Sequence, residues 1–349
     1  MSAIPVFLPW QVEHATAWLG SRERFAHAWL IHGVAGIGKR QFVQAAAASL
    51  LCENPQQGLA CGHCAACQWI ASGSHPDLRL IRPDAVTVEE GGEAAEEAPE
   101  GAAVVKKAPS KEIRVDQLRA LATWFNTATH RSGWRVAVLY PAEALNSISA
   151  NALLKVLEEP PAHTVFLVVA DAPDRLLPTL VSRCRRLPLP VPSSDDSVAW
   201  LHGQGIAEPD LWLAAAGAAP LLALSLAQGG DTACPDWIER FIAPLAQGLS
   251  PDIGALADLL EKQAAITWID NLQRLCTDLL LAATHAPVRY FPGLATKTGA
   301  VAGRASLLNL AEACRWLAQQ RALAGHPLNA KLLTHATLQR IAFACGPVK

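Results

Sequence analysis

The sequence contains no uncharged apolar run that approaches the roughly 18 residues a membrane span requires. The first ten residues lack a basic region followed by a long apolar run, so no signal peptide is evident. Neither sign of charge is in excess, because 29 basic and 31 acidic residues give a net charge of −2. This balance argues against a protein that binds nucleic acid by charge alone. We therefore expect a cytoplasmic protein without membrane contact, in which the 9 cysteines are reduced or metal-bound.

Tyrosine and phenylalanine are scarce, with 2 and 8 copies in 349 residues, whereas alanine and leucine dominate. This composition favours helix over strand. A hydrophobic fraction of 51% supplies large cores, and the length suggests two or three domains.

A glycine-rich stretch between an apolar run and a helix-prone run reads Gly-Val-Ala-Gly-Ile-Gly-Lys-Arg. Strand, glycine turn and helix is the setting of a phosphate-binding loop, in which backbone N–H groups and the helix N-terminus face an anion. Such loops continue with a serine or threonine that holds Mg²⁺, but here the position is Arg40. The simpler alternative is a glycine turn without a ligand. The candidate phosphate-binding residues are Gly33, Gly36, Gly38, Lys39 and Arg40.

The Mg²⁺-binding hydroxyl is not the only missing part of an ATP-hydrolysing site, because the expected acidic residues are missing as well. In phosphate-loop ATPases, the end of a buried strand supplies an aspartate for Mg²⁺ and often a glutamate that activates water. The corresponding strand, predicted at 135–140, ends in Tyr140 and Pro141, and Glu143 comes two residues too late. The sequence therefore predicts a nucleotide-type site that does not hydrolyse ATP.

Four cysteines fall within 16 residues in the pattern C-x8-C-x2-C-x2-C: Cys52, Cys61, Cys64 and Cys67. Four thiolates at this spacing suit one tetrahedral Zn²⁺ and close its coordination, which predicts a structural site. An iron–sulfur cluster is the competing interpretation, but the cysteine followed by proline is absent. Unligated cysteines are the other alternative, and His63 is expected to be a bystander.

Residues 84–112 differ in composition from the rest of the chain, with seven glutamates, many alanines and glycines, and no aromatic residue. Such a segment buries too little apolar surface to offset its ordering entropy, which predicts a disordered acidic insertion. A partner-binding acidic segment is the alternative.

The remaining patterns predict five buried strands and a series of helices. The strands are expected at 28–32, 78–81, 135–140, 165–170 and 187–189. The early helices are expected at 10–20, 41–51, 116–125 and 147–159, followed by a short helix that brings Arg183 to the surface. Later helices are expected at 237–245, 253–263, 266–284, 306–324 and 328–344, and Gly and Pro residues predict a loop at 287–303.

Two further motifs suggest a family. The chain carries Asn-Ala-Leu-Leu-Lys-Val-Leu-Glu-Glu-Pro-Pro at 151–161 and Ser-Arg-Cys at 182–184. Together with the phosphate loop and the four-cysteine module, they resemble the AAA+ subunits of bacterial DNA clamp loaders, and among these a member that does not hydrolyse ATP. The resemblance implies that Arg183 acts as an arginine finger at a neighbouring subunit's ATP. The alternative is a surface ion pair.

The resemblance also implies a fold class and a division into domains. It implies a parallel α/β AAA+ module at 1–190 containing the zinc module at 52–67, then a small helical lid at 191–235 and an all-α collar at 236–349. The implied partners are the tau/gamma motor subunits and the delta subunit of the loader, and indirectly the sliding clamp and primed DNA.

Two rival hypotheses remain. One is an active tau/gamma-type ATPase motor that uses Lys39 with an acidic pair such as Glu158-Glu159. The other is a zinc-finger DNA binder, which the near-neutral charge and the lack of a finger-type helix after Cys67 oppose.

Overall fold

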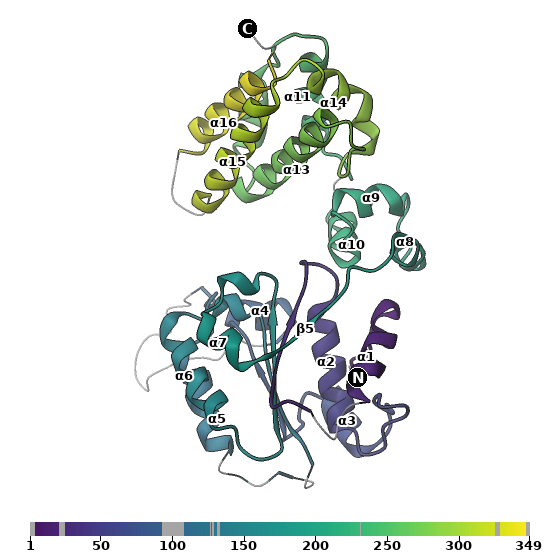
Figure 1. The fold of residues 1–349 in the computed structure, drawn as a ribbon, viewed down its shortest axis with the longest axis vertical. Helices are drawn as coiled ribbons and strands as arrows, with labels where there is room; N and C mark the ends of the chain where they lie inside the picture. Colours follow the sequence, from purple (N-terminus) through teal and green to yellow (C-terminus); the bar gives the residue numbers. More distant parts are fainter. Residues whose placement is uncertain are drawn as a thin grey trace. The chain divides into compact units, whose positions relative to one another are not determined.

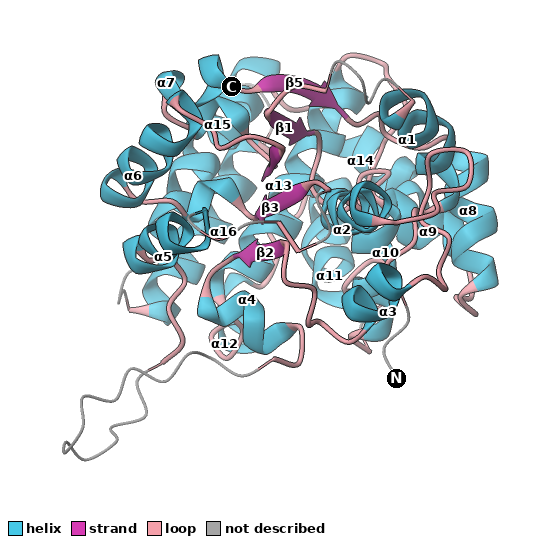
Figure 2. Ribbon diagram, turned by 90° about the horizontal axis from the view of Figure 1, so that it is seen from below, coloured by secondary structure: helices cyan, strands magenta, loops and turns pink. Residues whose placement is uncertain are grey.

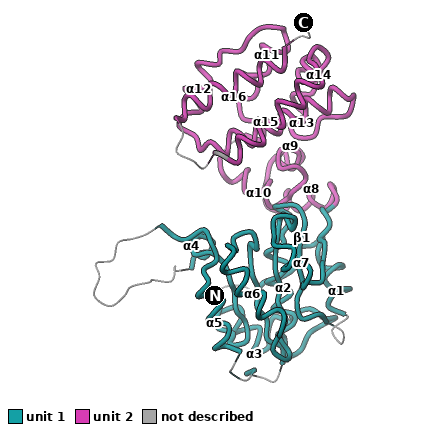
Figure 3. The backbone as a smooth tube through the Cα atoms, turned by 60° about the vertical axis from the view of Figure 1, so that its left-hand side comes forward, with its two compact units in different colours: residues 1–192 teal, residues 193–349 magenta. Residues whose placement is uncertain are grey.

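The computed structural model describes residues 4–20, 25–92, 108–125, 127, 129–130, 133–230, 232–324 and 329–346. The chain divides into two compact units, residues 1–192 and residues 193–349 (Figure 1; Figure 3). The first unit is a sheet flanked by helices, and the second is helical. The expected fold class, a parallel α/β module followed by helical domains, is confirmed.

The sheet of the first unit has five strands, all paired in parallel, in the order β2-β3-β4-β1-β5. The three central strands are runs of apolar residues buried on both faces, as parallel sheets covered on both sides require. All five predicted strands are present, with small changes in their ends: β1 (Ala28–His32), β2 (Leu78–Ile81), β3 (Arg135–Leu139), β4 (Thr164–Ala170) and β5 (Arg185–Pro188).

Helices cover both faces of this sheet, and Figure 2 shows the two layers on either side of the strands. One face packs against α1 (Val12–Leu19), α2 (Lys39–Leu51) and α3 (Ala65–Ala71), and a short helix η1 (Pro9–Gln11) precedes α1. The other face packs against α5 (Val115–Phe125), α6 (Ser147–Glu158) and α7 (Pro178–Arg183). Short 3-10 helices lie at η3 (Ala142–Ala144) and η4 (Pro173–Arg175).

The limits of α6 follow from local chemistry. The side-chain oxygen of Asn146 accepts the backbone N–H groups of Ile148 and Ser149, at 3.1 and 2.9 Å, which caps the helix. The helix ends at Glu158, just before Pro160 and Pro161. Proline disfavours helical backbone in the residue before it, so the sequence itself determines where the helix ends.

The expectation of disorder across 84–112 is wrong at its N-terminal side. Residues 84–89 form α4 (Asp84–Glu89), and the structure describes the chain again from residue 108. The backbone N–H of Ala85 donates to the carbonyl of Ser110 at 3.0 Å, and Ile113 is fully buried. The free energy gained from these contacts offsets the conformational entropy that the chain loses when this segment becomes ordered. The acidic composition of the segment alone does not indicate such contacts. The rest of the predicted insertion, residues 93–107, lies outside the described residues.

The described residues of the second unit form two separate hydrophobic cores. The first joins α8 (Ser194–Gly203), α9 (Pro209–Ala215) and α10 (Pro220–Gln228). The second joins the remaining helices: α11 (Asp236–Ala246), α12 (Ile253–Leu260), α13 (Ala265–Ala283), α14 (Ala295–Ala302), α15 (Leu307–Leu323) and α16 (Ala330–Ala344).

The loop predicted at 287–303 is correct only in its first part. There the buried carboxylate of Asp278 accepts the backbone N–H groups of Arg289, Tyr290 and Phe291, at distances between 2.7 and 3.2 Å. The second part instead forms η5 (Pro292–Leu294) and α14. Val301 and Ala302 are buried in the core, and this packing outweighs the low helix propensity of the glycines nearby.

Within the described part of the chain, no single helix is long and apolar enough to cross a membrane. One pair, α9 and α10, bent by 108° at the break between them, passes that test by length and composition alone.

Candidate functional site

The phosphate-loop motif has the predicted setting. Strand β1 ends at His32, the glycine-rich turn follows, and α2 begins at Lys39. Gly36 and Gly38 have φ values of 79° and 93°, a backbone conformation that favours glycine. At Gly33 a side chain is excluded by space, because a Cβ atom there would lie 2.8 Å from the carbonyl oxygen of Leu189.

The lysine of this loop is buried and already paired. The Lys39 ammonium donates to the carbonyl oxygens of Gly33 and Val34, at 2.8 and 2.5 Å, and lies 2.5 Å from the Asp171 carboxylate. All three donors of an ammonium are therefore used inside the protein. A nucleotide phosphate could reach Lys39 only by displacing these partners.

Asp171 is itself held in place. It follows β4, and Oε1 of Glu143 accepts the backbone N–H groups of Asp171 and Ala172, both at 2.7 Å. The sequence placed Glu143 too late in the chain to activate water. In the structure it positions the turn that carries the partner of Lys39.

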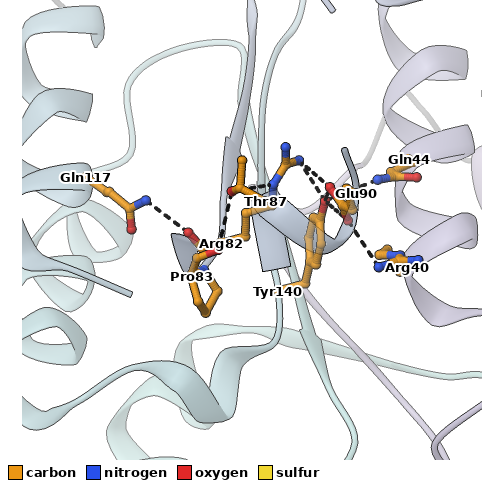
Figure 4. A network of polar contacts seen from close by, with 8 residues as sticks. All are labelled: Arg40, Gln44, Arg82, Pro83, Thr87, Glu90, Gln117 and Tyr140. Atoms are coloured by element: carbon orange, nitrogen blue, oxygen red, sulfur yellow. Dashed lines mark hydrogen bonds and ion pairs between the residues drawn. The ribbon is translucent and has the colours of Figure 1, made fainter. Parts of the chain in front are cut away.

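Arg40 and Tyr140, which the sequence motifs predict to replace Mg²⁺-binding residues, meet at a single carboxylate (Figure 4). Arg40 lies 3.2 Å from Oε1 of Glu90, and Arg82 lies 2.8 Å from Oε2. The Tyr140 hydroxyl donates to Glu90 at 2.9 Å and accepts from Arg82 at 2.9 Å and from Gln44 at 3.2 Å. A carboxylate, two guanidiniums and a phenol thus form one polar network around Glu90.

Burial raises the pKa of Tyr140 to about 12, against the opposing effect of the Arg82 charge. The phenol therefore keeps its proton at neutral pH and can donate to Glu90. No sequence motif points to Glu90 or Arg82. Glu90 lies in the segment predicted to be disordered, and no short spacing joins it to residues 40 and 140.

The polar network predicts a stability effect. Replacing Glu90 with alanine leaves the partly buried Arg82 and the exposed Arg40 without their shared carboxylate, so we expect a loss of about 1–3 kcal/mol in the free energy of unfolding. Urea denaturation measures this loss. Glu89→Ala removes an exposed neighbouring carboxylate and serves as the matched control. Equal stability of the two variants would show that the network contributes nothing.

The four cysteines of the predicted metal site converge. Their sulfur atoms all lie within 4.8 Å of one another, at the end of α2, in the following turn and at the start of α3. The Cys52–Cys64 and Cys61–Cys67 sulfur pairs are each 3.9 Å apart. Zinc–sulfur bonds of about 2.3 Å in a tetrahedron place sulfurs about 3.8 Å apart, so the cluster fits such an ion.

Backbone groups also support the sulfurs. The N–H of Cys61 donates to the Cys52 sulfur at 3.3 Å, and the N–H of Cys64 donates to the Cys61 sulfur at 3.4 Å. His63 is exposed, its Nδ1 lies 2.7 Å from the carbonyl oxygen of Cys61, and the sulfur cluster does not include it. The cluster can therefore hold a metal with four sulfur ligands.

Arg183 is the last residue of α7, and its side chain is 34% exposed. Nη1 donates to the carbonyl oxygen of Thr179, one turn earlier, at 2.9 Å. Nη2 forms an ion pair with the carboxylate of Glu158 at the end of α6. The short helix thus brings the guanidinium to the surface of the first unit, as predicted.

The sequence of this chain is similar to those of several known proteins. Residues 17–193 match the family model described as DNA polymerase III, delta subunit. The delta' subunit of Pseudomonas aeruginosa is 41% identical over 62% of this chain and 60% of its own length. The delta' subunit of Yersinia pestis is 30% identical over 75% of this chain and 71% of its own length.

The chain belongs to the DNA polymerase III delta' family. The match covers less than two thirds of the Pseudomonas delta' subunit. Among solved structures, a gamma subunit-related protein of DNA polymerase III from Thermotoga maritima aligns with 96% of this chain and 99% of its own. Its sequence identity is 15% and its TM-score is 0.43. Membership in the delta' family favours the delta' hypothesis over the tau/gamma-type and the zinc-finger alternatives.

Proposed function

We propose that this delta' chain is a non-hydrolysing subunit of the bacterial clamp loader that supplies Arg183 to the ATP site of a neighbouring motor subunit. The absence of ATP hydrolysis is inferred from the pairing of Lys39 with Asp171 and two loop carbonyls. An ATPase needs this ammonium free for the β- and γ-phosphates. In this chain its donors have protein acceptors.

The replaced metal positions support the same proposal. Phosphoryl transfer relies on Mg²⁺ to neutralise charge on the phosphates and on a carboxylate or similar group to orient water. Arg40 and Tyr140 provide neither function, because both are bonded to Glu90, and Pro141 has no polar side chain. The phosphate loop then serves as a structural turn between β1 and α2.

The proposed role of Arg183 rests on its position and chemistry. A guanidinium offers five donors in a planar fork that suits the oxygens of a transferring phosphoryl group. Arg183 ends a surface helix that follows the fourth strand along the chain, and it remains partly exposed. We propose that it faces the tau/gamma motor subunit beside it in the loader.

The proposed partners and domains follow the family. We expect assembly in the cytoplasm with tau/gamma and delta subunits, and an indirect action on the sliding clamp and primed DNA. We propose an AAA+ domain at 1–190, a lid at 191–235 and a collar at 236–349. The boundary between compact units at residue 192 and the two separate cores of the second unit support this division.

A structural zinc ion completes the proposal. Cys52, Cys61, Cys64 and Cys67 would supply four thiolates, leaving no open position for a substrate. Bound there, zinc would join the end of α2 to the start of α3. It would act on the shape of this module and not on phosphoryl transfer.

The test of the proposed function compares the chain alone with the assembled loader. We expect the purified chain to show no Mg²⁺-dependent ATP turnover above background, since Lys39, Arg40 and Tyr140 are tied to protein partners. Adding it to purified tau/gamma and delta subunits should raise DNA-stimulated ATP turnover and loading of the clamp.

Lys39→Ala identifies the site responsible for any activity that appears. An ATPase activity of the pure chain that disappears in this variant would favour the motor hypothesis. An absence of any effect on tau/gamma and delta subunits would contradict the assignment to the loader.

A further inference from the structure

Glu158 is the acidic partner of the surface arginine of α7. The two residues are 25 positions apart and lie at the ends of neighbouring helices, α6 and α7. The Glu158 side chain is 50% exposed and that of Arg183 is 34% exposed. The contact therefore lies at the surface, where Arg183 would meet another subunit.

The fold fixes the position of Glu158 more firmly than a surface loop would. The Asn146 cap starts α6, and the proline pair after Glu159 stops it. Both ends of the helix are therefore fixed, and with them the position of Glu158. The carboxylate lies at the negative end of its own helix dipole, which is unfavourable for an anion. A nearby guanidinium offsets this cost, and Arg183 is that guanidinium.

The bonding pattern leaves part of the guanidinium available. Of its five N–H donors, one on Nη1 is used by the Thr179 carbonyl and one on Nη2 by Glu158. The other three donors have no partner within the described part of the chain. Two anchors on its own chain thus restrict the long arginine side chain, and several donors remain for an anion.

We infer that Glu158 is a positioning residue for Arg183, holding the guanidinium in the orientation in which it meets the phosphate bound by the neighbouring subunit. This inference rests on the proposed function of Arg183. Catalytic groups gain effectiveness when a second set of contacts fixes their conformation before the reaction begins. Glu158 touches neither nucleotide nor substrate and acts only through the arginine.

The test uses the loader reconstituted with purified tau/gamma and delta subunits, and measures DNA-stimulated ATP hydrolysis. Glu158→Ala should lower the rate at the one ATP site that Arg183 serves by about two- to fivefold, the range expected for losing one exposed ion pair. Total turnover should fall by no more than it does with Arg183→Ala. KM for ATP should not change, because the motor subunit binds the nucleotide. Glu158→Gln retains an oxygen acceptor for Nη2 and should recover part of the rate.

Two comparisons make the inference specific. Glu159→Ala removes the adjacent exposed carboxylate and should leave kcat unchanged. In a chain that already carries Arg183→Ala, the further change Glu158→Ala should have no additional effect. Residues that act through each other show this non-additivity.

The outcomes separate this inference from the proposed function. A loss with Arg183→Ala but none with Glu158→Ala would overturn the positioning role and leave the finger intact. A rise in kcat with Glu158→Ala would also overturn it, because the carboxylate would then compete with phosphate. No loss with Arg183→Ala would overturn the finger itself.

Discussion

Replacing Arg183 with alanine should leave the isolated protein folded and lower ATP turnover at one site of the assembled loader. The side chain is partly exposed and its ion pair lies at the surface, so the free energy of unfolding should change by no more than about 1 kcal/mol. An arginine finger is typically worth about 10³ to 10⁵ in the rate at the site it serves. Total turnover should fall by the share which that site contributes, and clamp loading should slow.

The measurement combines complex formation with DNA-stimulated ATP hydrolysis for the same preparations. Arg183→Lys keeps the charge but not the planar fork of donors, so it should recover only part of the activity. Arg175→Ala, at an exposed arginine of η4, controls for loss of surface charge. Unchanged hydrolysis by an intact Arg183→Ala complex would show that Arg183 is only a surface arginine.

Removing two of the four clustered cysteines should abolish metal binding and destabilise the first unit. Elemental analysis of the purified protein should give about one zinc per chain, as a closed four-sulfur site requires. Cys61→Ser combined with Cys64→Ser should release the metal. Structural zinc sites contribute directly to folding energy, so the melting temperature should also fall.

The control for this prediction lies elsewhere in the chain. Cys234 lies outside the sulfur cluster, and Cys234→Ser should retain one zinc with little change in stability. Two results would contradict the prediction: a wild-type protein without zinc, or a double variant that still holds it.

The central sheet could be predicted from the sequence because its signals are local. The three central strands are continuous apolar runs, and each is followed by residues that break the strand. The cysteine cluster was also predictable, since its spacing restricts where the sulfurs can lie. The cap at Asn146 and the proline stop of α6 are signals of the same short range.

The errors arose where distant contacts decide the structure. Residues 84–89 have an acidic composition, yet they fold as α4, and the backbone of Ala85 bonds to that of Ser110. Residues 295–302 carry glycine next to a proline-containing turn, yet they fold as α14 because Val301 packs in the larger core of the second unit. Amino-acid composition reveals neither the Ala85–Ser110 hydrogen bond nor the packing of Val301.

The partners of the candidate site residues were also beyond sequence reasoning. Arg40 meets Glu90, and Arg183 meets Glu158, through the arrangement of the sheet and its helices and not through any motif spacing. Single charged residues pair with many possible partners along a chain of this length. Only the fold selects among them.

The shared carboxylate of Glu90 has a consequence for evolution. Because Arg40, Arg82 and Tyr140 all bond to it, their contributions to stability are coupled. A change of Arg40 to threonine would remove one of the cations that balance Glu90, and a change of Tyr140 to aspartate would remove the phenol that donates to it. Each single substitution is thus costly while the other residues remain. The four side chains therefore constrain one another, and a change at one of them is tolerated best when it is compensated at another.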